Sequence, residues 1–211
     1  MDVPLATEVN DTMYPIAPIL TLVIGGYLLG SLLPADWLVR RRTGKHPSEL
    51  GDNPGAAGAW RLAGPRAAIL TTLFDLVKGA LPLAAAKTLG LGDALWSNGL
   101  ALASVACAPV IGHNWPVFHR FRGGRGLSTA VGALLYISWP EMLPALVLGV
   151  IAAYWRKWAP LIGVVGFPLG LALMLVRGVA SPRVVAAVVV MLIVLVRQIP
   201  WLLANLTARK G

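Results

Sequence analysis

The chain alternates between long apolar segments and short polar connections. Seven apolar segments stand out, at about residues 15–39, 66–89, 94–117, 127–137, 140–154, 158–176 and 182–203. A helix needs roughly 20 apolar residues to cross a bilayer, and most of these segments approach or exceed that length. The pattern predicts an all-α fold, in which residues 1–211 form one integral-membrane domain of about seven transmembrane helices.

Two of the segments, 127–137 and 140–154, are short for a bilayer crossing. They are either one broken span or two shortened helices. We favour two helices, because the intervening Ser138-Trp139-Pro140-Glu141 has the composition of a turn at the membrane interface.

The composition supports this interpretation. Hydrophobic residues make up 57% of the chain and charged residues 13%, whereas soluble domains contain about 25% charged residues. The single cysteine, Cys107, lies in an apolar run, which leaves no intramolecular disulfide. We therefore expect one compact bundle rather than an anchor joined to a soluble domain.

Positive charge is distributed unevenly between the connections. With seven spans, one alternate set of loops contains fourteen of the eighteen Lys and Arg residues. This bias predicts an N-terminus outside and a C-terminus in the cytoplasm. Residues 1–14 then form a polar extracytoplasmic tail, and the loops 40–65 and 118–126 face the cytoplasm. The net charge of +9 therefore reflects topology and attraction to anionic lipids rather than nucleic-acid binding.

The most distinctive stretch is the basic, glycine-rich connection within residues 110–132. It carries His113, His119, Arg120, Arg122, Gly123, Gly124, Arg125 and Gly126. Glycines allow backbone N–H groups to approach an anion, a helix beginning near Leu127 adds its positive end, and arginines donate to phosphate oxygens. We interpret the stretch as a phosphate site, against the alternative of a loop whose arginines only set topology.

The first polar loop offers a second candidate anion site. Residues 50–61 contain Asn53 and Arg61 among several glycines, including Gly55. A glycine-rich turn of this kind can form a nest of backbone N–H groups around an anion. An ordinary flexible connector is the alternative.

A few further polar residues lie in or beside the apolar segments. Asp75 and Lys78 are three residues apart and can pair on one helix face, either as functional groups inside a span or as a buried structural pair. Ser31 occupies a position suited to close helix contact. His113 and His119 are candidate general bases at neutral pH, or else hydrogen-bonding anchors near the membrane interface. The spacing of His, Cys, Asp and Glu indicates no metal site, and we expect no cofactor.

Taken together, several motifs resemble the bacterial acyl-phosphate:glycerol-3-phosphate acyltransferases, the PlsY family. The motifs are Tyr27-Leu28-Leu29-Gly30-Ser31, Asn53-Pro54-Gly55-Ala56 with Arg61, Phe74-Asp75-Leu76-Val77-Lys78-Gly79, Gly112-His113-Asn114-Trp115-Pro116-Val117-Phe118, and Phe121 to Ala130 with Ser128 and Thr129. The resemblance implies a multi-pass protein of the bacterial inner membrane. It also implies direct transfer of an acyl chain from acyl phosphate to glycerol 3-phosphate, giving lysophosphatidic acid, without a covalent intermediate, cofactor or metal.

The resemblance carries site residues over to this chain. The phosphate-binding set is Asn53, Gly55, Arg61, Gly123, Gly124, Arg125, Gly126, Ser128, Thr129 and Arg197, with Ser31, Asp75 and Lys78 in support. The chain departs from the family in three motifs. A family serine has no counterpart near Asp52, Arg125 replaces a lysine, and a histidine and an acid are missing after Arg197.

These departures affect proton transfer more than anion binding. By position, Asp52, His113 or His119 can replace the missing base, and we place Asp52, His113 and Arg125 in the catalytic set. Two alternatives remain, namely a catalytically weak or silent relative that binds lipid phosphate, and a small carrier of organic anions.

Overall fold

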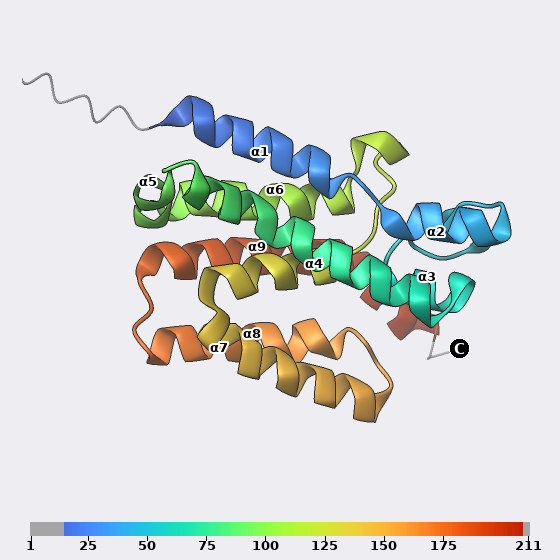
Figure 1. The fold of residues 1–211 in the computed structure, drawn as a ribbon. Helices are drawn as coiled ribbons and strands as arrows, with labels where there is room; N and C mark the ends of the chain where they lie inside the picture. The colour runs from blue at the N-terminus through green and yellow to red at the C-terminus, as the bar shows by residue number, and fades with distance from the viewer. Residues whose placement is uncertain (1–14, 209–211) are drawn as a thin grey trace, which may run out of the picture.

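The computed structural model describes residues 15–208, which form helices joined by short connections (Figure 1). The expected extracytoplasmic tail, residues 1–14, lies outside the described residues. The α-helices are α1 (Ile16–Gly30), α2 (Pro34–Thr43), α3 (Ala56–Ala63), α4 (Pro65–Thr88), α5 (Gly92–Ser97), α6 (Gly99–Asn114), α7 (Leu127–Arg156), α8 (Leu161–Val176) and α9 (Ser181–Ala208). Two 3-10 helices, η1 (Pro47–Leu50) and η2 (Val117–His119), lie in the connections.

Within the described part of the chain, five helical stretches are long and apolar enough to cross a membrane. They are Ile16–Thr43, Pro65–Thr88, Gly99–His119, Leu127–Arg156 and Ser181–Pro200. Leu161–Val176 is a shorter apolar helix. The structure thus supports a multi-pass, all-helical membrane protein.

Two of the expected continuous segments are broken. The chain leaves α1 at Ser31 and re-enters a helix at Pro34, which occupies the first turn of α2. Proline lacks an N–H and disfavours a helical residue before it, so Leu33 is extended. The third segment divides at Asn98, whose side chain accepts hydrogen bonds from the N–H groups of Leu100 and Ala101 and so caps α6.

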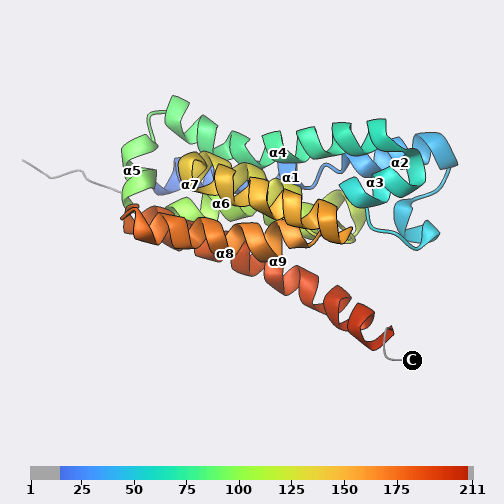
Figure 2. The same ribbon diagram turned by 90° about the horizontal axis from the view of Figure 1, so that it is seen from below.

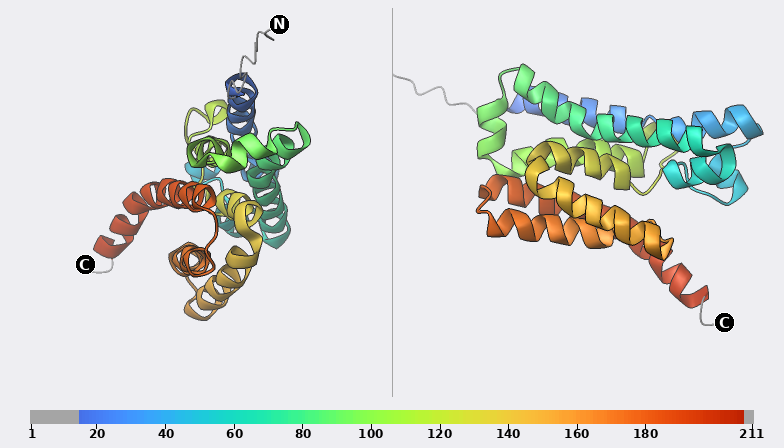
Figure 3. Two further views of the ribbon diagram at one scale, coloured as in Figure 1. Left: turned by 90° about the vertical axis from the view of Figure 1, so that its left-hand side faces the viewer. Right: turned by 60° about the horizontal axis from the view of Figure 1, so that its bottom comes forward.

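The turn predicted near residue 139 is present inside α7. Ser138 has non-helical backbone angles (φ −158°, ψ 67°), and the chain reverses direction there (Figures 1 and 3). Ser138 Oγ donates a 2.6 Å hydrogen bond to Glu141 Oε2. Arg177 Nε, from the end of α8, lies 3.4 Å from Glu141 Oε1.

Small residues allow the long helices to pack closely. A Cβ atom at Gly79 would collide with the carbonyl oxygen of Thr129, and one at Gly132 with that of Leu76, so α4 and α7 touch through their backbones. Glycine has no side chain to prevent this approach, which is a common means of packing helices in membranes. Figure 2 shows α4 along one side of the bundle and α8 and α9 along the other, with α7 between them.

The connections gather at two ends of the bundle. At one end lie α2, η1, α3 and η2, while α5, the turn in α7 and the α8–α9 connection lie at the other (Figure 1). The loops 40–65 and 118–126 therefore share one end, as their charge predicts. Residues 40–65 are more ordered than a loop, because they include η1, α3 and the end of α2.

Candidate active site

The glycine-rich loop packs tightly on the end of α6. Gly124 N–H donates to the carbonyl of His113 over 3.0 Å. A Cβ at Gly123 would meet the His113 carbonyl, and one at Gly124 would meet the His113 ring. Gly126 has a left-handed φ of +70° and precedes α7, which begins at Leu127 as the sequence predicts. These glycines are therefore required by close packing and by one left-handed position.

Arg197 reaches this loop from α9. Its Nε donates to the Gly124 carbonyl over 3.1 Å, and its Nη2 donates to the Gly123 carbonyl over 3.3 Å. Its guanidinium also lies 5.4 Å from the centre of the Trp115 ring. The structure thus brings together residues more than 70 positions apart, and it gives Arg197 contacts that hold the loop.

Asp52 and Arg61 form a forked ion pair beside the loop. Arg61 Nε donates to Asp52 Oδ2 over 2.7 Å, and Arg61 Nη2 donates to Asp52 Oδ1 over 2.6 Å. Asp52 Oδ1 also accepts the N–H of Asn53 over 2.8 Å. Gly55 is the residue before α3, and the α3 residue Gly58 lies against the Asn53 carbonyl where a Cβ would not fit. This close contact holds the turn that carries Asp52 against α3, the helix that carries Arg61.

The pKa values of this group follow from burial and charge. Burial alone would raise the pKa of Asp52, but the hydrogen bonds from Arg61 and from Asn53 N–H outweigh it and lower that pKa. The same pair raises the pKa of Arg61. A carboxylate held in its ionised form is a weak base at neutral pH. The geometry therefore gives Asp52 a role in orienting Arg61 rather than in accepting a proton.

Three arginines influence one another at this end of the bundle. Burial lowers the pKa of Arg125, and the neighbouring charges of Arg61 and Arg197 lower it further, whereas Asp52 acts in the opposite direction. Cations this close repel each other, and a bound anion relieves the repulsion. The three cationic positions named from the sequence thus converge on one region, the arginine cluster (Arg61, Arg125 and Arg197).

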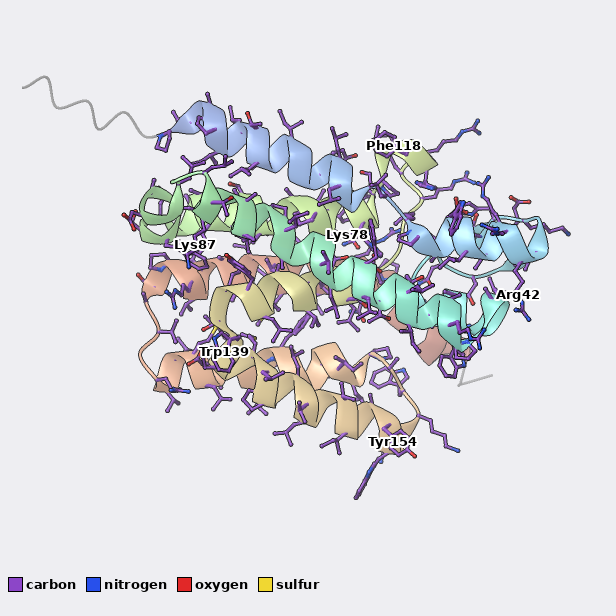
Figure 4. The ribbon with its side chains drawn as sticks, in the orientation of Figure 1. Arg42, Lys78, Lys87, Phe118, Trp139 and Tyr154 are labelled. Carbon is purple, nitrogen blue, oxygen red and sulfur yellow. The ribbon has the colours of Figure 1, made fainter. Side chains whose placement is uncertain are left out.

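His113, Asp75 and Lys78 form a buried charged network inside the bundle. Lys78 Nζ lies 2.8 Å from Asp75 Oδ1 and 3.0 Å from His113 Nδ1. His113 is 3% exposed, and Figure 4 places Lys78 within the bundle. The predicted pairing on one face of α4 is confirmed. The surroundings of His113 suit a support for the glycine loop better than a base open to substrate.

The remaining predicted residues have distinct surroundings. Ser31 is buried, where its Oγ donates to the Tyr27 carbonyl over 2.9 Å and accepts from Val117 N–H over 3.4 Å. Ser128 lies half-buried in the first turn of α7. Thr129 is fully buried, and its Oγ1 has no hydrogen-bond partner among the described residues. Ser31 and Thr129 therefore face the protein interior.

One cluster was not anticipated from the sequence. Asp36 is buried in α2. Its carboxylate oxygens lie 2.8 Å from Arg40 Nε, 3.2 Å from His46 Nε2 and 3.1 Å from His119 Nε2. The i,i+4 spacing of Asp36 and Arg40 was the only sequence signal for this cluster, and it indicates their pairing alone. His119, a candidate base, is thus tied to Asp36.

No group of three or more His, Cys, Asp or Glu side chains in residues 15–200 is arranged to hold a metal ion.

The fold and the site define a polytopic helical membrane protein with an arginine cluster at one end. The family model described as glycerol-3-phosphate acyltransferase matches residues 20–205. The chain belongs to the glycerol-3-phosphate acyltransferase family.

Individual relatives agree. The Pseudomonas putida glycerol-3-phosphate acyltransferase is 35% identical over 175 residues, covering 82% of this chain and 88% of that protein. The Rubrobacter xylanophilus protein of the same name is 43% identical over 135 residues, covering 64% and 62%. The relatives from Hahella chejuensis, Rubrobacter xylanophilus and Methylococcus capsulatus are matched over 62–66% of their own length, somewhat less than two thirds.

A solved structure shares the fold. The crystal structure of PlsY, an integral membrane glycerol 3-phosphate acyltransferase, in its glycerol 3-phosphate form has a TM-score of 0.75 and 26% identity, covering 90% of this chain and 93% of that one. The form with lysophosphatidic acid gives a TM-score of 0.77.

Proposed function

We propose that this protein transfers an acyl chain from acyl phosphate to glycerol 3-phosphate, releasing lysophosphatidic acid and inorganic phosphate. The observation that carries the proposal is the arginine cluster beside the glycine-rich loop. Both substrates carry a phosphate, and arginine is the side chain best suited to bind phosphate through two donors at once. The crystal structure of PlsY in its glycerol 3-phosphate form supports the choice of acceptor.

In this reaction a hydroxyl oxygen of glycerol 3-phosphate forms a bond to the acyl carbonyl carbon. The bond between that carbon and the phosphate oxygen breaks, and phosphate leaves with the electron pair. The leaving phosphate can take the hydroxyl proton, because phosphate oxygens are more basic than Asp52, whose pKa is lowered by Arg61. Arg61 and Arg125 would hold the two phosphates and stabilise developing charge, and Asn53, Gly55 and Ser128 would supply further hydrogen-bond donors.

The acyl chain would lie between α8 and α9. A groove of about 400 Å³ runs along both helices. It is lined by Gly163, Val164, Phe167, Pro168, Leu171, Val188, Met191, Leu192, Val194, Leu195 and Gln198. Gln198 directly follows Arg197 in the sequence. A lipid tail in this groove would place its polar end beside the arginine cluster.

The same proposal includes the topology. The two arms of α7 would cross separately, and together with α1, α4, α6, α8 and α9 they would make seven membrane crossings. The basic end of the bundle would face the cytoplasm of a bacterium, across its inner membrane, with the N-terminus outside. Membrane lipids are then the remaining partners, and nucleic acid is not a ligand.

A phosphate-release assay tests the activity. The purified protein in lipid would receive palmitoyl phosphate with and without glycerol 3-phosphate. We expect release that depends on the acceptor and falls at least tenfold in Arg125→Ala. Arg42→Ala is the matched control, because Arg42 is an exposed arginine at the same end of the bundle (Figure 4).

Two other results would favour the alternatives. Binding of palmitoyl phosphate without turnover would indicate a silent relative. Absence of both, with uptake of an organic anion into proteoliposomes, would indicate a carrier.

A further inference from the structure

A second pocket lies at the opposite end of the bundle from the arginine cluster. Its volume is about 770 Å³. It is formed where the end of α4, the short helix α5, the turn in α7 and the start of α9 meet. Figure 4 shows two of its residues, Lys87 and Trp139, at this end of the molecule.

The pocket is separate from the candidate active site. Arg183 lines the pocket, and Arg197 holds the glycine loop. These two residues are fourteen positions apart on α9, which corresponds to about 21 Å at 1.5 Å per residue. A ligand in this pocket would therefore meet the membrane leaflet opposite to the one beside the arginine cluster.

Two cations of the pocket are placed to meet an anion. The guanidinium of Arg183 lies 5.1 Å from the centre of the Trp96 ring. Trp96 in turn stacks on Tyr136, with ring centres 6.3 Å apart and an interplanar angle of 26°. Arg183 is thus oriented by an aromatic pair, which leaves its donors available. Lys87 lines the same pocket from the end of α4.

One acidic residue, Asp93, also lines the pocket. Among the described residues, neither Lys87 nor Arg183 makes an ion pair with it. The two cations and the carboxylate are therefore available to a ligand together. Their formal charges sum to +1, which suits a ligand of charge −1 that also carries hydrogen-bond donors for Asp93.

We propose that this pocket binds the headgroup of an anionic phospholipid of the phosphatidylglycerol type. Arg183 and Lys87 bind the phosphodiester, and Asp93 accepts hydrogen bonds from the glycerol hydroxyls. Trp139, which is 64% exposed, and Tyr136 also line the pocket, and aromatic residues are typical of the level where headgroups meet the hydrocarbon core. Basic pockets between transmembrane helices on the cytoplasmic side of membranes bind anionic headgroups, and the same pairing of cations with a phosphodiester applies at this end of the bundle.

Native mass spectrometry of the delipidated full-length protein in detergent tests the proposal. Phosphatidylglycerol, phosphatidylcholine and soluble glycerophosphoglycerol would be titrated separately. We expect one phosphatidylglycerol per chain, bound about tenfold or more tightly than phosphatidylcholine. The double variant Lys87→Gln with Arg183→Gln should weaken phosphatidylglycerol binding about tenfold, because it removes the charge-assisted hydrogen bonds to the phosphodiester.

Two single variants separate this site from general surface charge and from the candidate active site. Arg42→Gln removes a positive charge at the other end of the bundle, and Arg125→Ala alters the arginine cluster. Phosphatidylglycerol should bind both as it binds the wild type. A loss in either of them equal to that of the double variant would overturn the assignment.

Two further outcomes would also overturn it. One is equal affinity for the two lipids, and the other is binding of glycerophosphoglycerol as tight as that of the lipid, which would indicate a free phosphoester as the ligand.

A measurement without variants completes the test. Phosphatidylglycerol with a photoreactive headgroup should label residues 87–96 or 135–140 in the wild-type protein, and labelling confined to other segments would contradict the proposal.

Discussion

The ammonium group of Lys78 lies 3.0 Å from Nδ1 of His113, inside the helical bundle. Lys78 also donates to the carbonyl oxygens of Gly30 and Leu32, over 3.1 and 2.8 Å. One side chain of α4 thus connects the break after α1 with the end of α6. Because the His113 carbonyl holds Gly124, this interior network also supports the glycine-rich loop.

The network should be important for stability. Lys78→Met leaves the carboxylate of Asp75, 1% exposed, without its main partner. Removing one member of a buried ion pair costs about 3–5 kcal/mol, so we expect a loss of that order in the free energy of unfolding, measured by denaturant titration in mixed micelles. Adding Asp75→Asn should recover part of it, because the uncompensated charge is removed.

Lys87→Met is the matched control for this prediction, since Lys87 is an exposed lysine on the same helix. It should change the free energy of unfolding by less than about 0.5 kcal/mol. Equal effects of the two substitutions would show that the buried network does not stabilise the bundle.

Gly124 should not tolerate even a methyl group. In Gly124→Ala the new Cβ meets the His113 ring. Either the glycine-rich loop or the end of α6 must therefore shift, which costs about 1–3 kcal/mol of stability. We expect a lower melting temperature and a reduced rate of phosphate release. Gly25→Ala is the comparison, because a Cβ at Gly25 in α1 meets nothing within 4 Å and alanine favours a helix. A Gly124→Ala protein as stable and active as Gly25→Ala would refute the packing argument.

Asp52 should affect the rate of acyl transfer without determining how that rate depends on pH. Its pKa is lowered in the folded protein, so its pairing with Arg61 is complete above the ordinary carboxyl value near 3.9 and is lost only as the pH falls through the lowered pKa. Asp52→Asn should reduce kcat/KM about tenfold by releasing Arg61, while the shape of the pH profile between 5 and 9 stays the same. Loss of an inflection in that range would instead identify Asp52 as the base.

Features that depend on neighbouring residues were predictable from the sequence. The start of α7 at Leu127, the turn at Ser138 and the pairing of Asp75 with Lys78 all follow from spacing along the chain. The break between α1 and α2 was not predicted, although proline at position 34 was a local signal for it. These features need no knowledge of the tertiary fold, because each is decided within a few residues.

Contacts between distant segments were less accessible. The meeting of His46 and His119 on Asp36 depends on how η1 and η2 fold back over α2, and no local pattern encodes it. Arg197 was expected to bind phosphate, and only the tertiary structure shows that it donates to the loop carbonyls. A cationic residue can be recognised from the sequence as a candidate, whereas its partners are decided by packing.

The groove between α8 and α9 should control which acyl chains are accepted. Val188 lies at the end of the groove farthest along α9 from Gln198, a rise of about 15 Å at 1.5 Å per residue. Val188→Phe fills this end, and forcing a chain into an overpacked space costs about 1–3 kcal/mol. We expect kcat/KM for palmitoyl phosphate to fall about tenfold, while that for octanoyl phosphate is nearly unchanged. Leu175→Phe, at an exposed position on α8 outside the groove, should leave both values unaltered. Equal losses for the two chain lengths would place the acyl chain elsewhere on the bundle, because only a chain that reaches Val188 can distinguish the two substrates.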